Sequence, residues 1–368
     1  MLIGQHPQSA RRIDVVVAHD GNRLAAPLAR MLNGQFRVGG AKFDNTTELL
    51  ETTAKSIVFC MVRFTPQQLP NLRRIAAYSS SPPVFVFPTY HQTNIELAES
   101  FEQSKHFVAP FARDQVATAV RDALQLGVDT TWRKLKPIQQ KALKSSTESF
   151  DAVAAAIASG ERMPIAQVYD ACKDIQANLT DTTVDTWLDA LQHHHDSSFR
   201  HSMLVCGALA FFSHDIGIRG EDLRKITVGT FLHDAGKALI PLTVLDKPGK
   251  LDEEEYKVIQ RHPVFSRDIL TRQEELHPDV IAMAASHHEK LDGTGYPEGL
   301  SGGQISDIVR LTAISDVYSA LIEERSYKRG MSNDQAFEIM LGLDNHLDIF
   351  LVRKFREYVM DIFQTQAA

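Results

Sequence analysis

The chain has 368 residues, 43% of them hydrophobic, and a formal net charge of -7. This length leaves room for two domains with separate cores, and the acidic balance excludes a protein that coats a nucleic-acid polymer. The polar start has no apolar signal core, and no stretch approaches the ~20 apolar residues of a membrane span. The three cysteines lie far apart and form no CxxC motif, which is typical of reduced thiols packed in a core. We therefore expect a cytoplasmic protein that does not enter a membrane.

The first part of the chain alternates apolar runs with helical patterns. The apolar runs, which we expect to be buried strands, are 13–18, 56–62, 84–87 and 106–108. Helical spacing appears at 23–32 and again at 114–126. Strands that alternate with helices predict an α/β domain with a parallel sheet. We assign this domain to residues 1–126.

Helical patterns fill the rest of the chain. We expect residues 127–190 to form a helical linker that begins the second domain, and residues 191–368 to form an all-α bundle. Loops interrupt the pattern at 247–249 and at 293–303. No alternation typical of strands appears in this half of the chain.

Eleven of the fifteen histidines lie at or beyond His193, so the second domain is the place to look for chemistry. Neutral imidazole is the commonest metal ligand in proteins. His287 and His288 are adjacent and run into a loop with glycines, and His233 is followed directly by Asp234, whose carboxylate can bridge two metals. Lys237 follows four residues after His233, on the same face of a helix. A lysine there can neutralise a phosphate or protonate a leaving oxygen.

Five motifs between about 197 and 332 resemble the HD-GYP family of cyclic-di-GMP phosphodiesterases, part of the HD metal-phosphohydrolase superfamily. They are HDAGKALIP, LDKPGKLDEEEY, RHPVFSRDIL, HHEKLDGTGYPEGLSGGQI and AISDVYSALIEERSYKRGMS. All five occur in the order of the family, and the resemblance covers a little over a third of the chain. It implies a metal-dependent hydrolase that converts cyclic-di-GMP to linear pGpG, with slower cleavage to GMP as an option.

The resemblance also implies roles for single residues. His201, His233, Asp234 and Asp316 correspond to the ligands of a first metal. Asp234 corresponds to the bridge to a second metal, which is held also by His262, His287 and His288. Asp234 and Lys237 correspond to the catalytic pair, and Lys237, Arg325 and Lys328 to the residues that bind the substrate phosphates. Asp292, Gly293, Gly295, Tyr296 and Pro297 correspond to the GYP loop, which we expect to shape access without touching the chemistry.

Two divalent ions, iron or manganese, are the cofactors that the resemblance implies. The ligand set contains only nitrogen and oxygen donors, and on softness alone zinc also fits. Some family members place a Glu one turn before the first histidine, where it supports a third metal. This chain has Ser197 there, which favours two metals. Ser266 replaces a family Gly, a change to which we attach little functional meaning. Glu289 is expected either to orient an imidazole or to face solvent.

Two alternatives to hydrolysis of cyclic-di-GMP stay open. The domain is then either a cyclic-dinucleotide sensor with weak catalysis or a hydrolase of another cyclic dinucleotide, such as cyclic GMP-AMP. As partners, the resemblance implies a diguanylate cyclase (GGDEF) domain that docks on the GYP loop. The helical stretch 130–191 is expected to form a homodimer interface.

The first domain resembles, more weakly, a degenerate response-regulator receiver. Ala18-His19-Asp20 follows the first predicted strand, and Ala109-Pro110-Phe111 precedes the last helix. A receiver carries its phosphorylated aspartate at the end of its third strand, where this chain has Cys60-Met61-Val62. It carries a lysine where this chain has Ala109. We therefore expect no aspartyl phosphorylation.

Overall fold

The computed structural model describes residues 14–33, 36, 38–43, 55–79, 81–180, 183–192, 194, 196–245, 247, 250–323 and 330–366. They form two compact units that divide between Lys134 and Leu135. The predicted boundary at 126 lies inside a helix, α5, which runs from Arg113 to Trp132. The predicted domain limits as such stay predictions.

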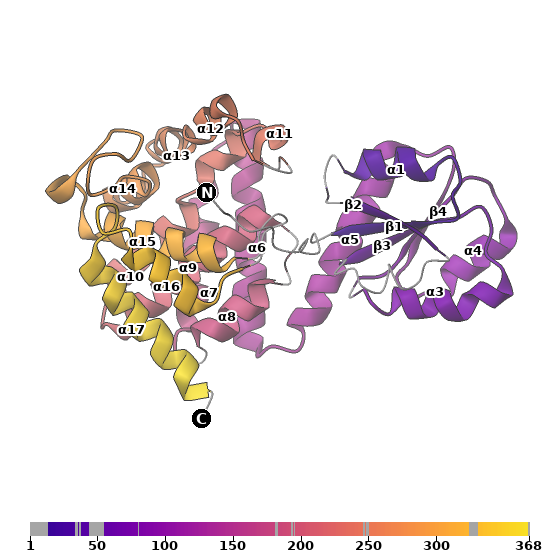
Figure 1. Cartoon of the computed structure of the whole chain (residues 1–368), viewed down its shortest axis with the longest axis horizontal. Coiled ribbons are helices and arrows are strands. Elements are labelled where there is room, and N and C mark those ends of the chain that lie inside the picture. The colour runs from indigo at the N-terminus through magenta and orange to yellow at the C-terminus, as the bar shows by residue number, and fades with distance from the viewer. Residues whose placement is uncertain are drawn as a thin grey trace, which may run out of the picture. The chain divides into compact units, whose positions relative to one another are not determined.

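Five short strands, mostly of apolar residues, form the sheet of the first unit (Figure 1). They are β1 (Val15–His19), β2 (Val38–Lys42), β3 (Ser56–Cys60), β4 (Val84–Phe87) and β5 (Lys105–Val108). All neighbours pair in parallel, in the order β2-β1-β3-β4-β5. This is one of the two common doubly wound orders, and it confirms the predicted α/β class.

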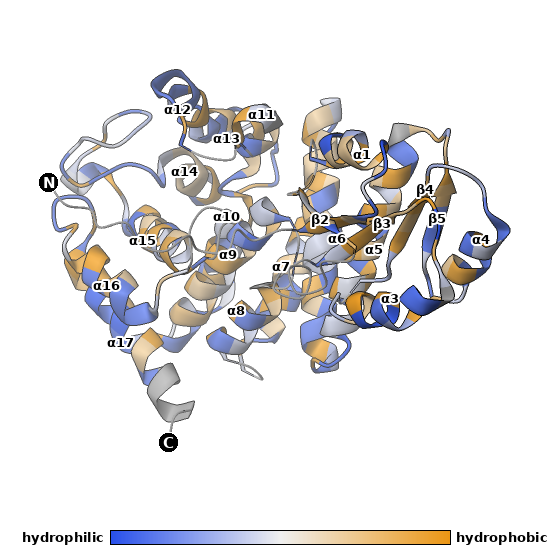
Figure 2. Cartoon of the chain, turned by 45° about the vertical axis from the view of Figure 1, so that its right-hand side comes forward, coloured by the Kyte–Doolittle hydropathy of each residue, from blue (hydrophilic) through white to orange (hydrophobic). Residues whose placement is uncertain are grey.

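Helices cover both faces of this sheet. On one face, α1 (Ala25–Leu32) and α5 pack on the side of Val15 and Val17. On the other, α3 (Leu69–Ala76) and α4 (Gln92–Glu99) pack on the side of Phe59 and Phe85. The central strands of a parallel sheet with both faces covered are apolar throughout, and Figure 2 shows β3 and β4 in the orange of hydrophobic residues between the helices.

Four of the five strands coincide with predicted apolar runs, and β2 does not. Its sequence, Val-Gly-Gly-Ala-Lys, contains two glycines, and Ala41 is the one buried residue of these five. Glycine is depleted in strands, so no apolar run marks the segment. β2 is an edge strand that pairs only with β1, and its conformation is set by that pairing and not by its own composition.

The second unit is helical, as predicted. Its helices are α6 (Pro137–Ser159), α7 (Ile165–Ala177), α8 (Val184–Gln192), α9 (Ser197–Asp215), α10 (Gly220–Leu232), α11 (Leu242–Leu245), α12 (Glu253–Ile259), α13 (His262–Leu270), α14 (Pro278–Ser286), α15 (Asp307–Ile322), α16 (Asn333–Leu341) and α17 (Ile349–Gln366). Short 3-10 helices lie at η1 (Pro66–Gln68, in the first unit), η2 (Ala235–Leu239) and η3 (Gly302–Gln304).

Helix α9 is the centre of this unit. Every residue from Phe199 to Ser213 is buried, and a helix that is buried all round belongs in the middle of a bundle. Its start is fixed by Asp196, whose carboxylate accepts a hydrogen bond from the Phe199 backbone N–H at 2.8 Å, as an N-cap residue does. The position of His201, one turn into α9, is therefore set by both a cap and a core.

The three cysteines are buried and free of disulfides. Burial raises the pKa of the Cys60 thiol to about 11 and that of Cys206 to about 12. Both thiols are therefore protonated near neutral pH, and core packing is their role in the fold. Within the described residues, no helix has the length and apolar character needed to cross a membrane.

Close packing of α8 on α9 gives a test of the fold. The Trp187 indole N–H donates to the Met203 carbonyl at 3.0 Å, and an added Cβ at Gly207 would lie 2.2 Å from Trp187 Nε1. We expect Gly207→Ala to lower the free energy of unfolding by about 1–3 kcal/mol, because overpacking forces neighbours to shift. Urea unfolding followed by circular dichroism measures this change.

The matched control is Gly303→Ala, where an added Cβ meets nothing within 4 Å. Its free energy of unfolding should stay within about 0.5 kcal/mol of the parent. Equal effects of the two substitutions would contradict the packing of Trp187 against α9.

Candidate functional site

The structure brings all seven predicted metal ligands together in the helical unit. Long buried helices supply two of them, His201 from α9 and Asp316 from α15. The others lie at helix ends, where the backbone leaves the helix: His233 and Asp234 after α10, His262 at the start of α13, and His287 and His288 after α14. Six of the seven side chains are buried, and His288 is half-buried.

Three of the histidines use the same local contact. The Nδ1 atoms of His233, His262 and His287 lie 2.6, 2.8 and 3.0 Å from the backbone carbonyl of the residue three positions earlier. Those carbonyls belong to the last turns of helices, where no helical N–H is left to bond them. A carbonyl only accepts, so Nδ1 carries the hydrogen and the Nε2 lone pair is free. Each imidazole is thus held in the tautomer that binds a metal through Nε2.

These Nε2 lone pairs converge on the two oxygens of Asp234. Oδ2 lies 3.3 Å from His233 Nε2 and 3.9 Å from His201 Nε2. Oδ1 lies 3.1 Å from His262 Nε2 and 3.8 Å from His287 Nε2. Each oxygen of one carboxylate therefore faces a different pair of imidazoles.

Two groups in the described residues have the spacing of a metal site. One is His201, His233 and Asp234, and the other is His262, His287 and His288. Asp316 links them, since one of its oxygens lies 2.9 Å from His201 Nε2 and the other 3.8 Å from His288 Nδ1. The division matches the two groups that the sequence predicts, while the assignment of each ligand to a metal stays a prediction.

The donor set fits divalent cations. His233 Nε2 and Asp234 Oδ1 are buried and have no hydrogen-bond partner among the described residues, and buried polar atoms of this kind are rare unless a ligand satisfies them. His262 Nε2 and His287 Nε2 lie only 3.2 Å apart. Two lone pairs at this distance repel, and a cation bound by both removes the repulsion. Imidazole and carboxylate without thiolate suit iron, manganese or zinc.

The Asp234 carboxylate lies beside a cation, the Lys237 ammonium. Burial alone raises the pKa of this carboxyl, but Lys237 and His233 outweigh it and keep the pKa well below its ordinary value. Lys237 Nζ contacts Oδ2 directly. The lysine side chain is 22% exposed while Asp234 is 7% exposed, so the ammonium lies on the open side of the carboxylate.

His287 and His288 are neutral at pH 7. Burial lowers the pKa of His287 well below its ordinary value, and the imidazoles of His288 and His233 lower it further. Burial likewise lowers the pKa of His288 to about 4, against the opposing effect of Asp316. Neutral imidazole is the form that binds metal, so both side chains are ready to bind without losing a proton.

His201 has a second partner that the sequence analysis missed. The carboxylate of Glu323 lies 3.5 Å from His201 Nδ1 and accepts a hydrogen bond from Arg200 Nε at 2.9 Å. The Arg200 and Glu323 side chains are both almost fully buried. Burial lowers the pKa of His201, but the hydrogen bonds with Asp316 and Glu323 outweigh it, so the pKa is raised. The sequence signal for this contact was Arg200, a charged residue directly before a predicted ligand in an apolar helix. Such a charge requires a partner when it is buried.

The GYP loop is fixed by a residue whose role was predicted wrongly. Glu289 neither orients an imidazole nor faces solvent. Its buried carboxylate accepts backbone hydrogen bonds from Glu298 at 2.7 Å, Gly299 at 3.1 Å and Leu300 at 3.0 Å. One side chain thus closes the loop that begins just after the ligand pair.

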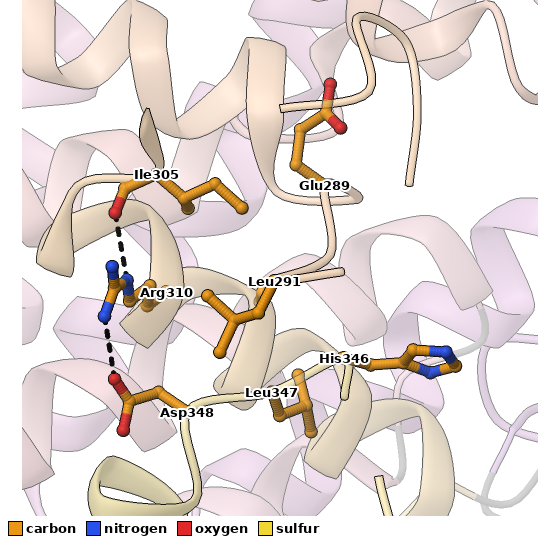
Figure 3. Close-up of a pocket in the computed structure, with 8 residues that line it drawn as sticks. Glu289, Leu291, Ile305, Arg310, His346, Leu347 and Asp348 are labelled. Atoms are coloured by element: carbon orange, nitrogen blue, oxygen red, sulfur yellow. Dashed lines mark hydrogen bonds and ion pairs between the residues drawn. The ribbon is translucent and has the colours of Figure 1, made fainter. Parts of the chain in front are cut away.

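The base of the loop is fixed by Arg310. Its guanidinium donates to the Ile305 and Gly302 carbonyls and to Asp348, each at 2.9 Å. Figure 3 shows Arg310 between Ile305 and Asp348 at a small pocket, with Glu289 at the far side. None of the described residues that line this pocket is a predicted metal ligand. The pocket is therefore separate from the histidine cluster.

Within the loop, Gly293 has a positive φ of 79° and an added Cβ at Gly295 would lie 2.4 Å from the Lys290 backbone nitrogen. Both glycines are therefore required by the turn. Asp292 accepts hydrogen bonds from the Thr294 backbone and hydroxyl. The ring of Tyr296, which precedes a cis peptide bond to Pro297, lies 4.8 Å from the His288 ring. The loop thus contacts a predicted ligand, which we did not expect.

Two predicted substrate residues, Arg325 and Lys328, lie outside the described residues. Their assignment to ligand phosphates therefore stays a prediction. The described chain reaches Glu323, at the end of α15, just before this segment.

Comparison with known proteins finds relatives of the helical unit. A family model described as an HD domain matches residues 185–349. A cyclic di-GMP phosphodiesterase of Pseudomonas aeruginosa is 34% identical over 158 residues, which is 43% of this chain and 38% of that protein. The 3'3'-cGAMP-specific phosphodiesterase 3 of Vibrio cholerae is 38% identical over 140 residues, 38% of this chain and 30% of that protein.

The match with each of these relatives spans about a third of the relative's length. Among solved structures, an HD-GYP-type protein of Bdellovibrio bacteriovorus is 17% identical, with a TM-score of 0.47 over 67% of this chain and 81% of that chain. The family match covers all seven converging side chains. Residues 185–349 therefore match the HD domain family, and within this range the chain is similar to cyclic-dinucleotide phosphodiesterases.

Proposed function

We propose that the helical unit is a two-metal hydrolase that cleaves a phosphodiester bond of a cyclic dinucleotide, with cyclic-di-GMP as the leading substrate. The observation that carries this proposal is the placement of Asp234. One carboxylate oxygen faces His233 and His201, and the other faces His262 and His287. A bridging carboxylate of this kind is typical of sites that hold two ions side by side.

Iron or manganese would be held by His201, His233, Asp234 and Asp316 in the first position, and by Asp234, His262, His287 and His288 in the second. Bound there, two such ions supply an activated water and offset charge on the phosphoryl oxygens. The protein's own share is orientation, because the Nδ1 contacts fix three imidazole rings before any metal arrives. A first product of linear pGpG follows from one cleavage, and GMP from a second.

Lys237 is the group that we assign to the leaving oxygen. Its ammonium contacts Asp234 Oδ2 from the open side of the site. A phosphate that enters from that side would meet Nζ, which would donate a hydrogen bond to the leaving 3'-oxygen and a proton to it as the P–O bond breaks. Arg325 and Lys328 are proposed to bind the other phosphate groups.

The relatives support this substrate class and leave the bases open. Those named above act on cyclic di-GMP and on 3'3'-cGAMP. The described ligands read phosphate, so cyclic GMP-AMP is the alternative substrate. A weak sensor is the other alternative, and the complete set of ligands favours the enzyme.

Metal analysis and product analysis together test the proposal. We expect the anaerobically purified chain to hold about two ions and to convert cyclic-di-GMP to pGpG. His262→Ala should remove about one ion, while the double change His233→Ala with Asp234→Ala should remove both ions and all turnover. The control is His214→Ala, on a partly exposed histidine outside the cluster. Unchanged turnover in the double variant would contradict the assignment, and binding without product would favour the sensor.

The role of Lys237 has a separate test. Lys237→Met should lower kcat on cyclic-di-GMP by about 10²–10⁴-fold, the usual contribution of a general acid, and should leave the metal content unchanged. The same variant should lose much less activity on bis(p-nitrophenyl) phosphate, whose leaving group needs no proton. Lys247→Met is the matched control, because Lys247 pairs with Glu255 away from the cluster. An equal loss on both substrates would rule out proton donation.

For the first unit we propose a receiver-like module that takes no phosphoryl group. Its strand order supports the likeness, and β3 ends at Cys60, whose thiol is buried. The Asp20 carboxylate is already engaged by the Val62 backbone at 2.7 Å and by the Asn22 side chain at 2.6 Å. Incubation with acetyl phosphate and Mg²⁺ should add no phosphoryl mass to the intact chain. A phosphorylated product that disappears in Asp20→Asn would contradict the proposal.

The predicted homodimer and the predicted docking of a GGDEF domain on the GYP loop stay predictions. The loop itself is suited to docking, because Glu289 holds its backbone in one conformation.

A further inference from the structure

The segment with the most predicted chemistry has little regular structure of its own. His233 and Asp234 lie between the end of α10 at Leu232 and the 3-10 helix η2, and Lys237 lies within η2, so the three fall within five residues. Hydrogen bonds in 3-10 helices have poorer geometry than those in α-helices. The position of Asp234 therefore depends on what this segment packs against.

The segment packs against the first turns of α13. An added Cβ at Gly236 would lie 2.2 Å from the His262 carbonyl oxygen and 2.5 Å from the Ser266 backbone nitrogen. Only glycine allows this approach. The backbone that carries Asp234 is thus in direct contact with the helix that carries His262.

One hydroxyl joins the two backbones. Ser266 Oγ donates to the His233 carbonyl at 3.0 Å and accepts from the Gly236 N–H at 2.8 Å. Ser266 is fully buried. The His233 carbonyl lies at the end of α10, where helical partners run out, and the two bonded groups flank Asp234 on either side. The hydroxyl therefore satisfies both backbone groups and closes the segment around the carboxylate.

The same face of α13 carries His262 and Ser266, whose two hydrogen bonds to the His233 carbonyl and the Gly236 N–H we call the clasp. Ser266 follows His262 by four residues, which places both on one side of the helix. Any shift of α13 relative to the segment changes the distance between Asp234 Oδ1 and His262 Nε2, which is 3.1 Å. Both atoms are proposed to bind the second metal, Asp234 as the bridge and His262 as a ligand.

We propose that Ser266 is a positioning residue that sets the affinity of the second metal. It acts through Asp234 and His262 and touches neither metal nor substrate. The inference rests on the proposed metal centre and deepens it, because it explains why a buried hydroxyl stands where the family motif has glycine. Residues that orient ligands typically contribute 10–100-fold to metal affinity.

The test compares Mn²⁺ binding by the metal-free full chain and by Ser266→Ala, with calorimetry giving the affinity of each site. We expect Ser266→Ala to weaken the second site by about 10-fold or more and the first site much less. Ser266→Thr, which keeps the hydroxyl, should restore most of the affinity. Ser213→Ala is the matched control, a fully buried serine whose hydroxyl has no hydrogen-bond partner among the described residues. It should leave both sites unchanged.

Other outcomes are decisive as well. Equal Mn²⁺ affinities in Ser266→Ala and the parent would overturn the inference, even where the variant is less stable to urea. A parent that binds two Mn²⁺ ions but cleaves no cyclic dinucleotide would contradict the proposed substrate. The measured Mn²⁺ affinities would then still decide the role of Ser266. A parent that binds no Mn²⁺ would overturn both.

The parent chain offers a second measurement that needs no variant. In the metal-free protein the Gly236 amide should exchange with deuterium slowly, because it donates to a buried hydroxyl. Exchange at the rate of an unfolded peptide would contradict the clasp.

Discussion

The negative charge on Asp234 is the constraint on which the helical unit depends. A buried carboxylate loses its hydration, and the loss is made good only by cations and hydrogen-bond donors nearby. Here the Lys237 ammonium contacts the carboxylate on one side, and on the other the imidazole Nε2 atoms face it across the place where metal cations would bind. The helices α9, α10, α13 and α14 each bring at least one of these groups or lead into one. Their packing can be understood as the scaffold that surrounds one charge with partners.

Helix ends are what make this scaffold possible. His233 and His287 follow directly on the last residue of a helix, and His262 comes three residues after α12. At each of these places a carbonyl needs a donor, and the imidazole Nδ1 supplies it. The same bond turns the opposite nitrogen toward the centre. One interaction, the hydrogen bond from Nδ1 to the carbonyl three residues earlier, thus both stabilises the helix end and orients the imidazole for a metal. It occurs at all three histidines.

Much of this was predictable because the ligands sit in contiguous motifs. His233-Asp234 and His287-His288 are adjacent in sequence. The prediction that Lys237 shares a helix face with His233 was wrong, because α10 ends at Leu232 and Lys237 lies in η2, from which it contacts Asp234. What lay beyond the sequence were partners from distant segments. Glu323 meets Arg200 and His201 across more than a hundred residues, and Ser266 meets Gly236 across thirty. Strand β2 was not predicted for a related reason, because it is a strand through its pairing with β1 and not through its composition. Local patterns record local periodicity, and they carry no record of which buried groups will meet.

The GYP loop shows how a local motif and a distant contact combine. The glycines of the motif permit the turn, but Glu289 holds it, with three backbone N–H groups bound to one carboxylate. Glu289 follows His288 directly, and Tyr296 returns to place its ring against the His288 imidazole. The loop therefore starts and ends at the same ligand. A carboxylate and a ring therefore hold the loop at two points next to His288, so the loop that borders the site is in direct contact with the second group of ligands.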